Sequence, residues 1–186
     1  LAEIRNLALK QATGDWVVFL DGDCLCPPRF VEQQLRLAHF DRLLAGNRRL
    51  LDSAQSSEIL ETGYVHKKFV NANGGKKLDV WPGTFYRDLS PKRWQKVRGC
   101  NIGIARDKAL EIGGFDEAYR GWGKEDSDFA ARAINHGISV RLGQHAVTVL
   151  HLYHAEADRG GLNQNQARLD TVLNSDRFLP ERSMLI

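Results

Sequence analysis

Three short polar clusters carry the residue types that could do chemistry: Asp21-Gly22-Asp23, Gly121–Asp128 and His151-Leu152-Tyr153-His154. In the first, two carboxylates flank one glycine. One carboxylate can bind a divalent cation while the other meets a hydroxyl or water, and the glycine lets the backbone come close. Asp-Gly is also a strong turn dipeptide, so the spacing alone leaves a binding site and a plain turn equally open.

The second cluster places three carboxylates at the start of a predicted helix, at Glu125, Asp126 and Asp128. Free N–H groups and the helix dipole stabilise an acid at this position, so a structural cap is the alternative for one of them. A helix cap requires only one acid, so a structural role of this kind does not explain the other two carboxylates. Gly121 and Gly123 flank a tryptophan, which is typical of a loop that closes over a ligand and stacks on a sugar ring.

The third cluster holds two histidines three residues apart, His151 and His154. In an extended strand they would point to opposite faces, so both can bind one ion only if the chain turns there. A buried structural histidine at 151 is the alternative. Together with the carboxylate pair, the cluster favours manganese over calcium, and zinc is disfavoured because no thiolate or compact set of three ligands accompanies it.

Helices and strands must bring these clusters together. Residues 16–20 form an unbroken apolar run that predicts a strand buried on both faces, as in a parallel sheet, and it ends at the first aspartate pair. Open α/β sheets bind ligands at this end of their strands. Before it, Leu1, Ile4, Leu7 and Ala8 predict a helix capped by Gly14. After it, Pro27-Pro28 predict a helix with Phe30, Val31, Leu35 and Ala38 on its apolar side.

The pattern weakens over residues 46–98, which read as an insertion or binding loop, although residues 56–70 have helical character. A strand is predicted over 101–105, followed by a short helix with Asp107 as its N-cap. Further elements are a helix over 125–136, strands over 138–142 and 146–150, and a helix near 164–173 without a strong packing signature.

Composition fits one soluble globular domain and names no activity. The chain has 186 residues, a net charge of +3, 42% hydrophobic and 26% charged residues. Its basic residues are scattered, so nucleic acid is not an expected partner. Three cysteines without a disulfide framework, no membrane span and no signal peptide predict a cytoplasmic protein.

The clusters, taken with their flanking segments, resemble family 2 glycosyltransferases of the GT-A fold. The second half resembles the galactosyltransferase-like branch, which includes bacterial chondroitin-type polymerases. The matching segments are residues 4–8, 17–23, 98–103, 113–117 and 121–126. The resemblance implies an α/β fold with a mixed sheet flanked by helices. It divides the chain into a metal and nucleotide half (1–45), a variable insertion (46–98), an acceptor and catalytic half (99–154) and a C-terminal tail (155–186).

The resemblance also implies roles for single residues. Asp126 would be the catalytic base, and Asp23, His151 and His154 would bind Mn²⁺ or Mg²⁺. Substrate-binding roles fall on Arg5, Asp21, Asn101, Trp122 and Glu125. The implied reaction is inverting transfer of a hexose from a UDP-sugar to a glycan or lipid-linked acceptor in surface polysaccharide synthesis, at the inner membrane face if the acceptor is a lipid.

The family ordinarily begins with a further strand and helix, so the resemblance implies that the first strand and helix of the fold are missing here. An exposed sheet edge would follow, with self-association through it and weak or absent transfer by the 186-residue chain alone. Two other interpretations are a glycan- or nucleotide-sugar-binding fragment without catalysis and a metal-dependent hydrolase.

Overall fold

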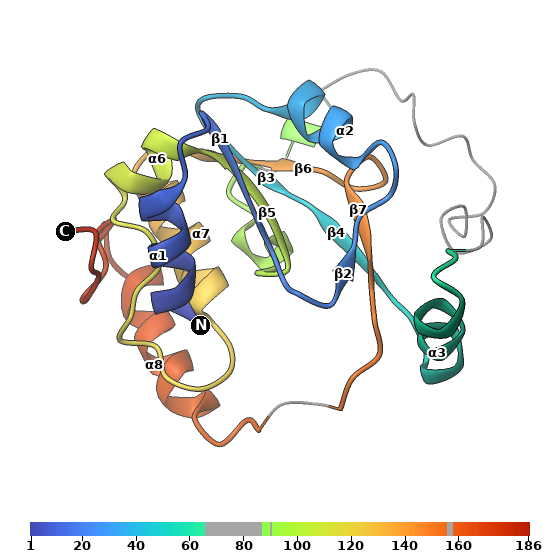
Figure 1. Ribbon diagram of the computed structural model, residues 1–186. Helices are drawn as coiled ribbons and strands as arrows, with labels where there is room; N and C mark the ends of the chain where they lie inside the picture. The colour runs from blue at the N-terminus through green and yellow to red at the C-terminus, as the bar shows by residue number, and fades with distance from the viewer. Residues whose placement is uncertain (66–86, 90, 156–157) are drawn as a thin grey trace.

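The computed structural model describes residues 1–65, 87–89, 91–155 and 158–186 of the chain (Figure 1). In chain order the elements are α1 (Ala2–Gln11), β1 (Trp16–Leu20), β2 (Cys24–Leu25), α2 (Phe30–Leu37), β3 (Arg42–Ala45), β4 (Asn47–Leu50), α3 (Ser53–Thr62), the 3-10 turn η2 (Trp94–Lys96), β5 (Asn101–Ala105), α6 (Arg106–Glu111), α7 (Glu125–Asn135), β6 (Ser139–Leu142), β7 (Thr148–His151) and α8 (Leu162–Leu173). None of the helices in these residues is long and apolar enough to cross a bilayer.

The strands form two mixed sheets. The four-stranded sheet has the order β1-β5-β3-β6, and the three-stranded sheet has the order β2-β7-β4. Strands β3 and β6 run parallel, as do β4 and β7, whereas β5 pairs antiparallel with both β1 and β3. This confirms the predicted α/β fold with a mixed sheet flanked by helices, of GT-A-like architecture.

Strand β1 has the predicted bounds, but the prediction of parallel pairing was wrong. It pairs antiparallel with β5, with Leu20 opposite Asn101, and among the described residues it is the edge strand of its sheet. Its apolar run has another cause, because successive side chains enter two different cores. Val17 and Phe19 pack on one face of the sheet, and Trp16 and Val18 pack on the other.

Helices cover both faces of the four-stranded sheet. Figure 1 shows α1, α6, α7 and α8 gathered on one side and α2 on the other, whereas α3 packs through Ile59 against Leu150 of the three-stranded sheet. Under the first group, Phe115 stacks on Phe129 at 4.3 Å between ring centroids, and Phe19 meets Phe115 edge-on at 5.0 Å. Burying each such ring contributes about 2–3 kcal/mol. This aromatic core fixes β1 against α7, the two elements from which the first two polar clusters extend.

The predicted helices at 1–8 and after Pro27-Pro28 exist, but their buried faces differ from the apolar ones. In α1, Ile4 is 69% exposed, whereas Arg5 is 7% exposed. In α2, Val31 and Leu35 are exposed and Gln34 is buried. Periodicity failed here because buried polar side chains with internal partners stabilise these faces as apolar ones would.

Two further predictions need correction. The N-cap of α6 is Ala105, without a side-chain cap, and Asp107 lies in the first turn instead. The helix near 164–173 exists as α8, and it does pack, since Leu169 and Val172 are fully buried and form a core with Ala131 of α7. The predicted helix over 56–70 is seen as α3 up to Thr62, and residues 66–70 lie outside the described part of the chain.

Candidate active site

The carboxylate of Asp23 and the imidazoles of His151 and His154 converge on one point. His151 Nε2 lies 3.5 Å from Asp23 Oδ1, and His154 Nε2 lies 3.3 Å from Asp23 Oδ2. One ligand atom from each residue lies within 4.8 Å of the other two. The His151 ring is buried, and that of His154 is half exposed. The cluster therefore has one side closed by protein and one open to a ligand.

Backbone carbonyls orient both rings. His151 Nδ1 is 3.0 Å from the Leu152 carbonyl oxygen, and His154 Nδ1 is 2.7 Å from that of Ala155. Each ring therefore turns its Nε2 toward Asp23. In a neutral ring with its proton on Nδ1, that Nε2 can bind a cation shared with the Asp23 carboxylate. Imidazole and carboxylate ligands of this kind fit Mn²⁺ well and Mg²⁺ less well.

The chain turns directly after His151, which lets both histidines face the same aspartate. Strand β7 ends at His151, opposite Cys24 of β2. Leu152 N then donates to the Asp23 carbonyl at 2.9 Å, and Tyr153 N donates to Ser56 Oγ of α3 at 2.7 Å. These bonds hold the turn, so the condition set by the sequence for a shared ion is met.

Arg5 links the first two polar clusters. Its buried guanidinium donates from Nη2 to Asp21 Oδ1 at 3.0 Å and from Nη1 to Glu125 Oε1 at 3.1 Å. It also lies over the Phe115 ring, 5.0 Å from the centroid. A Cβ at Gly99 would lie 2.7 Å from Nη2, so this close approach requires glycine. Contact of Arg5, Asp21 or Glu125 with substrate stays a prediction, and the observed role of Arg5 is to position the two acids.

Asp126 lies in the first turn of α7 and is held by three donors. Gly99 N donates to Oδ2 at 2.8 Å, and Ser127 N and Ser127 Oγ donate to Oδ1 at 2.7 and 3.2 Å. The side chain is half-buried. Its carboxylate is thus fixed in orientation while part of it stays accessible, an arrangement suited to a general base.

The other two acids of this cluster have different surroundings. Burial raises the pKa of Glu125, and the neighbouring charge of Asp126 raises it further, against the opposing effect of Arg5. Asp128 points into the core, where its Oδ2 accepts from Arg132 Nε at 2.7 Å and both side chains are fully buried. Asp128 is therefore structural, and the three carboxylates have three separate roles.

Trp122 lies on a loop that α8 holds in place. Its side chain is 45% exposed, and the Arg159 guanidinium lies 4.9 Å from the ring centroid. The buried Asn165 of α8 donates from Nδ2 to the carbonyls of Arg120 and Gly123, both at 2.9 Å. The predicted sugar contact of Trp122 is untested, but its exposed ring is accessible for one.

Asn101 is placed differently from the other predicted site residues. It is fully buried, and its Nδ2 donates to the carbonyls of Val147 at 2.7 Å and Asn47 at 3.0 Å. Its Oδ1 accepts from Gln34 Nε2 at 3.3 Å. All its polar atoms are engaged within the protein, so it joins the two sheets. The substrate contact that was expected of it finds no support in this placement.

A thiol pair that no sequence pattern indicated lies beside the aspartates. Cys24 lies next to Asp23, and Arg48 Nη1 lies 3.9 Å from Cys100 Sγ. A hydrogen bond from Cys24 lowers the pKa of Cys100, as does the positive charge of Arg48, and the same bond raises the pKa of Cys24. The pairing of β2 with β7 places Cys24 opposite His151 and so beside the site. A strand of only two residues cannot be paired from sequence.

Known families match the whole site region. Residues 1–86 match the family described as glycosyl transferase family 2, and residues 87–155 match the family described as N-terminal domain of galactosyltransferase. The first part of the chain is thus similar to family 2 glycosyltransferases, and the following part is similar to the galactosyltransferase family. The mixed α/β fold is consistent with this class.

Two curated relatives are both named chondroitin synthase. The protein from Escherichia coli is 25% identical over 174 residues, which cover 84% of this chain and 25% of that protein. The protein from Pasteurella multocida (strain Pm70) is 25% identical over 166 residues, covering 76% of this chain and 17% of that protein. The chain thus spans about a quarter or less of the length of these relatives.

Proposed function

We propose that the chain is the catalytic part of an inverting glycosyltransferase, which transfers a hexose from a UDP-sugar to a growing glycan or lipid-linked acceptor in surface polysaccharide synthesis. One observation carries the proposal. Asp23, His151 and His154 come from distant parts of the chain, and their Nε2 atoms and carboxylate converge on one point. The similarity to both glycosyltransferase families and to the relatives named chondroitin synthase supports sugar transfer as the use of this site.

In this proposal Asp126 takes the proton from the acceptor hydroxyl as its oxygen attacks the anomeric carbon of the donor. The bond to UDP breaks on the opposite side, which inverts the configuration. Gly99 N and the Ser127 donors keep the carboxylate in the orientation needed for proton removal. Trp122 lines the sugar and excludes water, which would otherwise hydrolyse the donor.

Asp23, His151 and His154 would hold the divalent cation, and a bound Mn²⁺ would supply Lewis-acid stabilisation of the diphosphate leaving group. Few further side chains of the protein are then needed to bind and orient the nucleotide. Asp21 would bind the ribose or base, and Arg5 keeps its carboxylate beside that of Glu125. A hydrolase with paired metals would need more carboxylates around the cation than the described residues supply.

The test combines binding with transfer. Calorimetry should detect UDP binding only with Mn²⁺, and Asp23→Ala should abolish it. Asp126→Asn should keep metal-dependent UDP binding but lower the rate of sugar transfer by about 10²–10⁴-fold, since only the base is lost. Glu61→Gln, which alters an exposed acid of α3, is the matched control and should change neither. An unchanged transfer rate in Asp126→Asn would remove Asp126 as the base. Binding without transfer in any assay would instead favour a non-catalytic binding fragment.

A further inference from the structure

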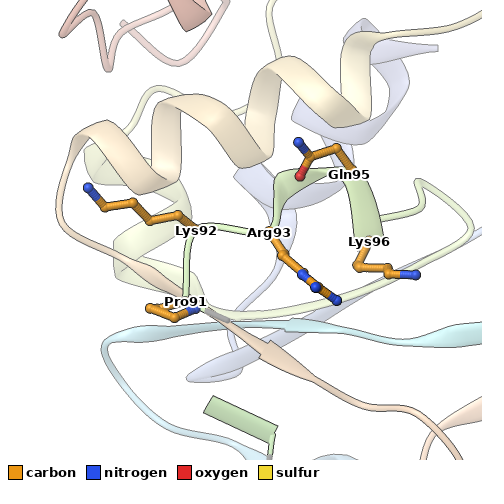
Figure 2. Close-up of a pocket in the computed structure, with 5 residues that line it drawn as sticks. All are labelled: Pro91, Lys92, Arg93, Gln95 and Lys96. Atoms are coloured by element: carbon orange, nitrogen blue, oxygen red, sulfur yellow. The ribbon is translucent and has the colours of Figure 1, made fainter. Parts of the chain in front are cut away.

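A hollow of about 630 Å³ opens beside the 3-10 turn η2, and none of the described residues that line it belongs to the three polar clusters. Its lining residues are Pro91, Lys92, Arg93, Gln95 and Lys96. Figure 2 shows Arg93 and Lys96 extending from one side of the turn and Lys92 extending from the other. We call Lys92, Arg93 and Lys96 the cationic turn. Three positive side chains within five residues thus border one hollow.

The charges of the cationic turn have no acidic partner in the described ranges. All three side chains are exposed, and within residues 1–65, 87–89, 91–155 and 158–186 no carboxylate forms an ion pair with any of them. Arg98 adds a fourth charge, because its Nη1 folds back to donate to the Gln95 carbonyl at 3.2 Å. Elsewhere on the surface, Arg29, Lys108 and Arg177 each pair with a glutamate. A solvated but unneutralised cluster of this kind attracts a polyanion.

The turn is held rigidly on the protein. Trp94 packs against the core that α7 forms with α8, at Ala131 and Leu169. Val97 is fully buried on the following side. On the preceding side, Val140 N donates to the Pro91 carbonyl at 2.8 Å. The cations therefore project from a fixed backbone, which reduces the entropy lost when a ligand binds.

The cationic turn is also close along the chain to the proposed base. Lys96 precedes Gly99 by three residues, which limits their Cα separation to about 11 Å. Gly99 N donates directly to Asp126. A glycan whose terminal hydroxyl lies at Asp126 thus needs to extend only a few sugar units to reach the turn.

We propose that the cationic turn binds the acceptor as an acidic polysaccharide, through carboxylates on sugar units that lie several units behind the reacting end. The proposal rests on the proposed function, since it assumes that the acceptor reacts at Asp126. The lysine ammonium groups and the Arg93 guanidinium pair with uronate carboxylates. Nucleic acid fits less well, because Trp94, the aromatic residue of the turn, is partly buried against the core and offers only part of its ring for stacking on bases.

The experiment measures binding of a fluorescently labelled, unsulfated chondroitin octasaccharide to the 186-residue chain by polarisation, at about 50 and 200 mM salt. A neutral maltooctaose and a single-stranded DNA octamer are the comparison ligands. The variant replaces Lys92, Arg93 and Lys96 by serine. The matched control replaces Lys10, Arg36 and Arg182, three exposed cations outside the turn, and removes the same charge. Circular dichroism checks the fold of both.

We expect the uronate octasaccharide to bind at least tenfold more tightly than the neutral one. The turn variant should lose this tenfold preference for the uronate octasaccharide and much of the salt dependence of its binding. The affinity of the control variant should stay within twofold of that of the unmodified chain. Equal binding by the turn variant, an equal loss in the control, or preferred binding of DNA would each overturn the proposal. Uronate binding that depends on the turn in a chain that shows no Mn²⁺-dependent UDP binding would support the polyanion site while contradicting the proposed function, so the two failures are distinguishable.

Discussion

A single side chain, Arg5, orients two acids of the proposed site. Its guanidinium donates to Asp21 on one side and to Glu125 on the other, and it lies buried against Phe115. A fork of planar donors can serve two carboxylates at fixed angles, which a lysine cannot do. The nucleotide side and the acceptor side of the proposed site are therefore oriented by the same cation.

Glu125 gives a prediction at this scale. Its pKa lies above the ordinary 4.5 in the folded chain, chiefly because of burial, so the ionised form is disfavoured by folding. The folded state then binds more protons than the unfolded state in the window between 4.5 and the raised value, and stability falls as the pH rises through that window. Glu125→Gln removes this dependence.

Urea unfolding of both proteins at several pH values checks it. Below pH 4.5 the unmodified chain should be at least as stable as Glu125→Gln. Toward pH 7 its free energy of unfolding should decrease relative to that of the variant. A difference that does not vary with pH would contradict the raised pKa. Groups common to both proteins cancel in the comparison.

At the scale of elements, α7 combines a structural and a chemical acid within one turn. Asp126 faces Gly99 and the open side, whereas Asp128 faces Arg132 in the core. The Arg132 guanidinium also donates to the carbonyls of Ile112 and Gly114, both at 2.7 Å. The helix thereby fastens the loop after α6, which leads to the second polar cluster.

Asp128→Asn should destabilise the chain by about 3–5 kcal/mol, because it leaves the buried Arg132 charge without its counter-charge. Denaturant unfolding measures the loss. Asp107→Asn, at an exposed acid of α6, is the control and should cost at most about 0.5 kcal/mol. A loss as small as that of the control would mean that the pair contributes little.

The loop that carries Trp122 depends on one amide of α8. Asn165→Ala removes the donor that Arg120 and Gly123 share. We expect trypsin to cut at Arg120 or Lys124 several-fold faster in this variant, since the loop opens more often. Asn163→Ala, at an exposed position of the same helix, should leave the cleavage rate unchanged. Equal rates in both variants would show that other contacts hold the loop.

Sequence patterns predicted the elements well and their surroundings poorly. Strand 101–105 and the helix starting at Glu125 have their predicted bounds, because a strong apolar run and a run of acids mark them. The buried faces of α1 and α2 could not be predicted, since Arg5 and Gln34 gain their partners from distant segments. The proximity of Cys24 to Cys100 could not be predicted for the same reason, because the two residues come from distant segments. Convergence of the two histidines on Asp23 depended on a turn that no local pattern encodes.

The whole molecule brings residues together across long separations in the chain. Arg5 meets Glu125 120 positions away, and Asn6 Nδ2 donates to Ser183 Oγ 177 positions away, at 3.2 Å. The acids of Asp116 and Glu117 accept from backbone N–H groups at 181–184. The C-terminal segment thus closes the structure around α1. The predicted self-association, membrane contact and cytoplasmic location remain predictions at this scale.

The bonds of Asn6 have a consequence for how the chain is made. During synthesis α1 leaves the ribosome long before residue 183, so its buried Asn6 waits without that partner while the 177 following positions are added. At about 5–20 residues per second, this interval lasts roughly 10–35 s. During that time, the asparagine that is buried in the folded protein stays partly exposed to water on the nascent helix.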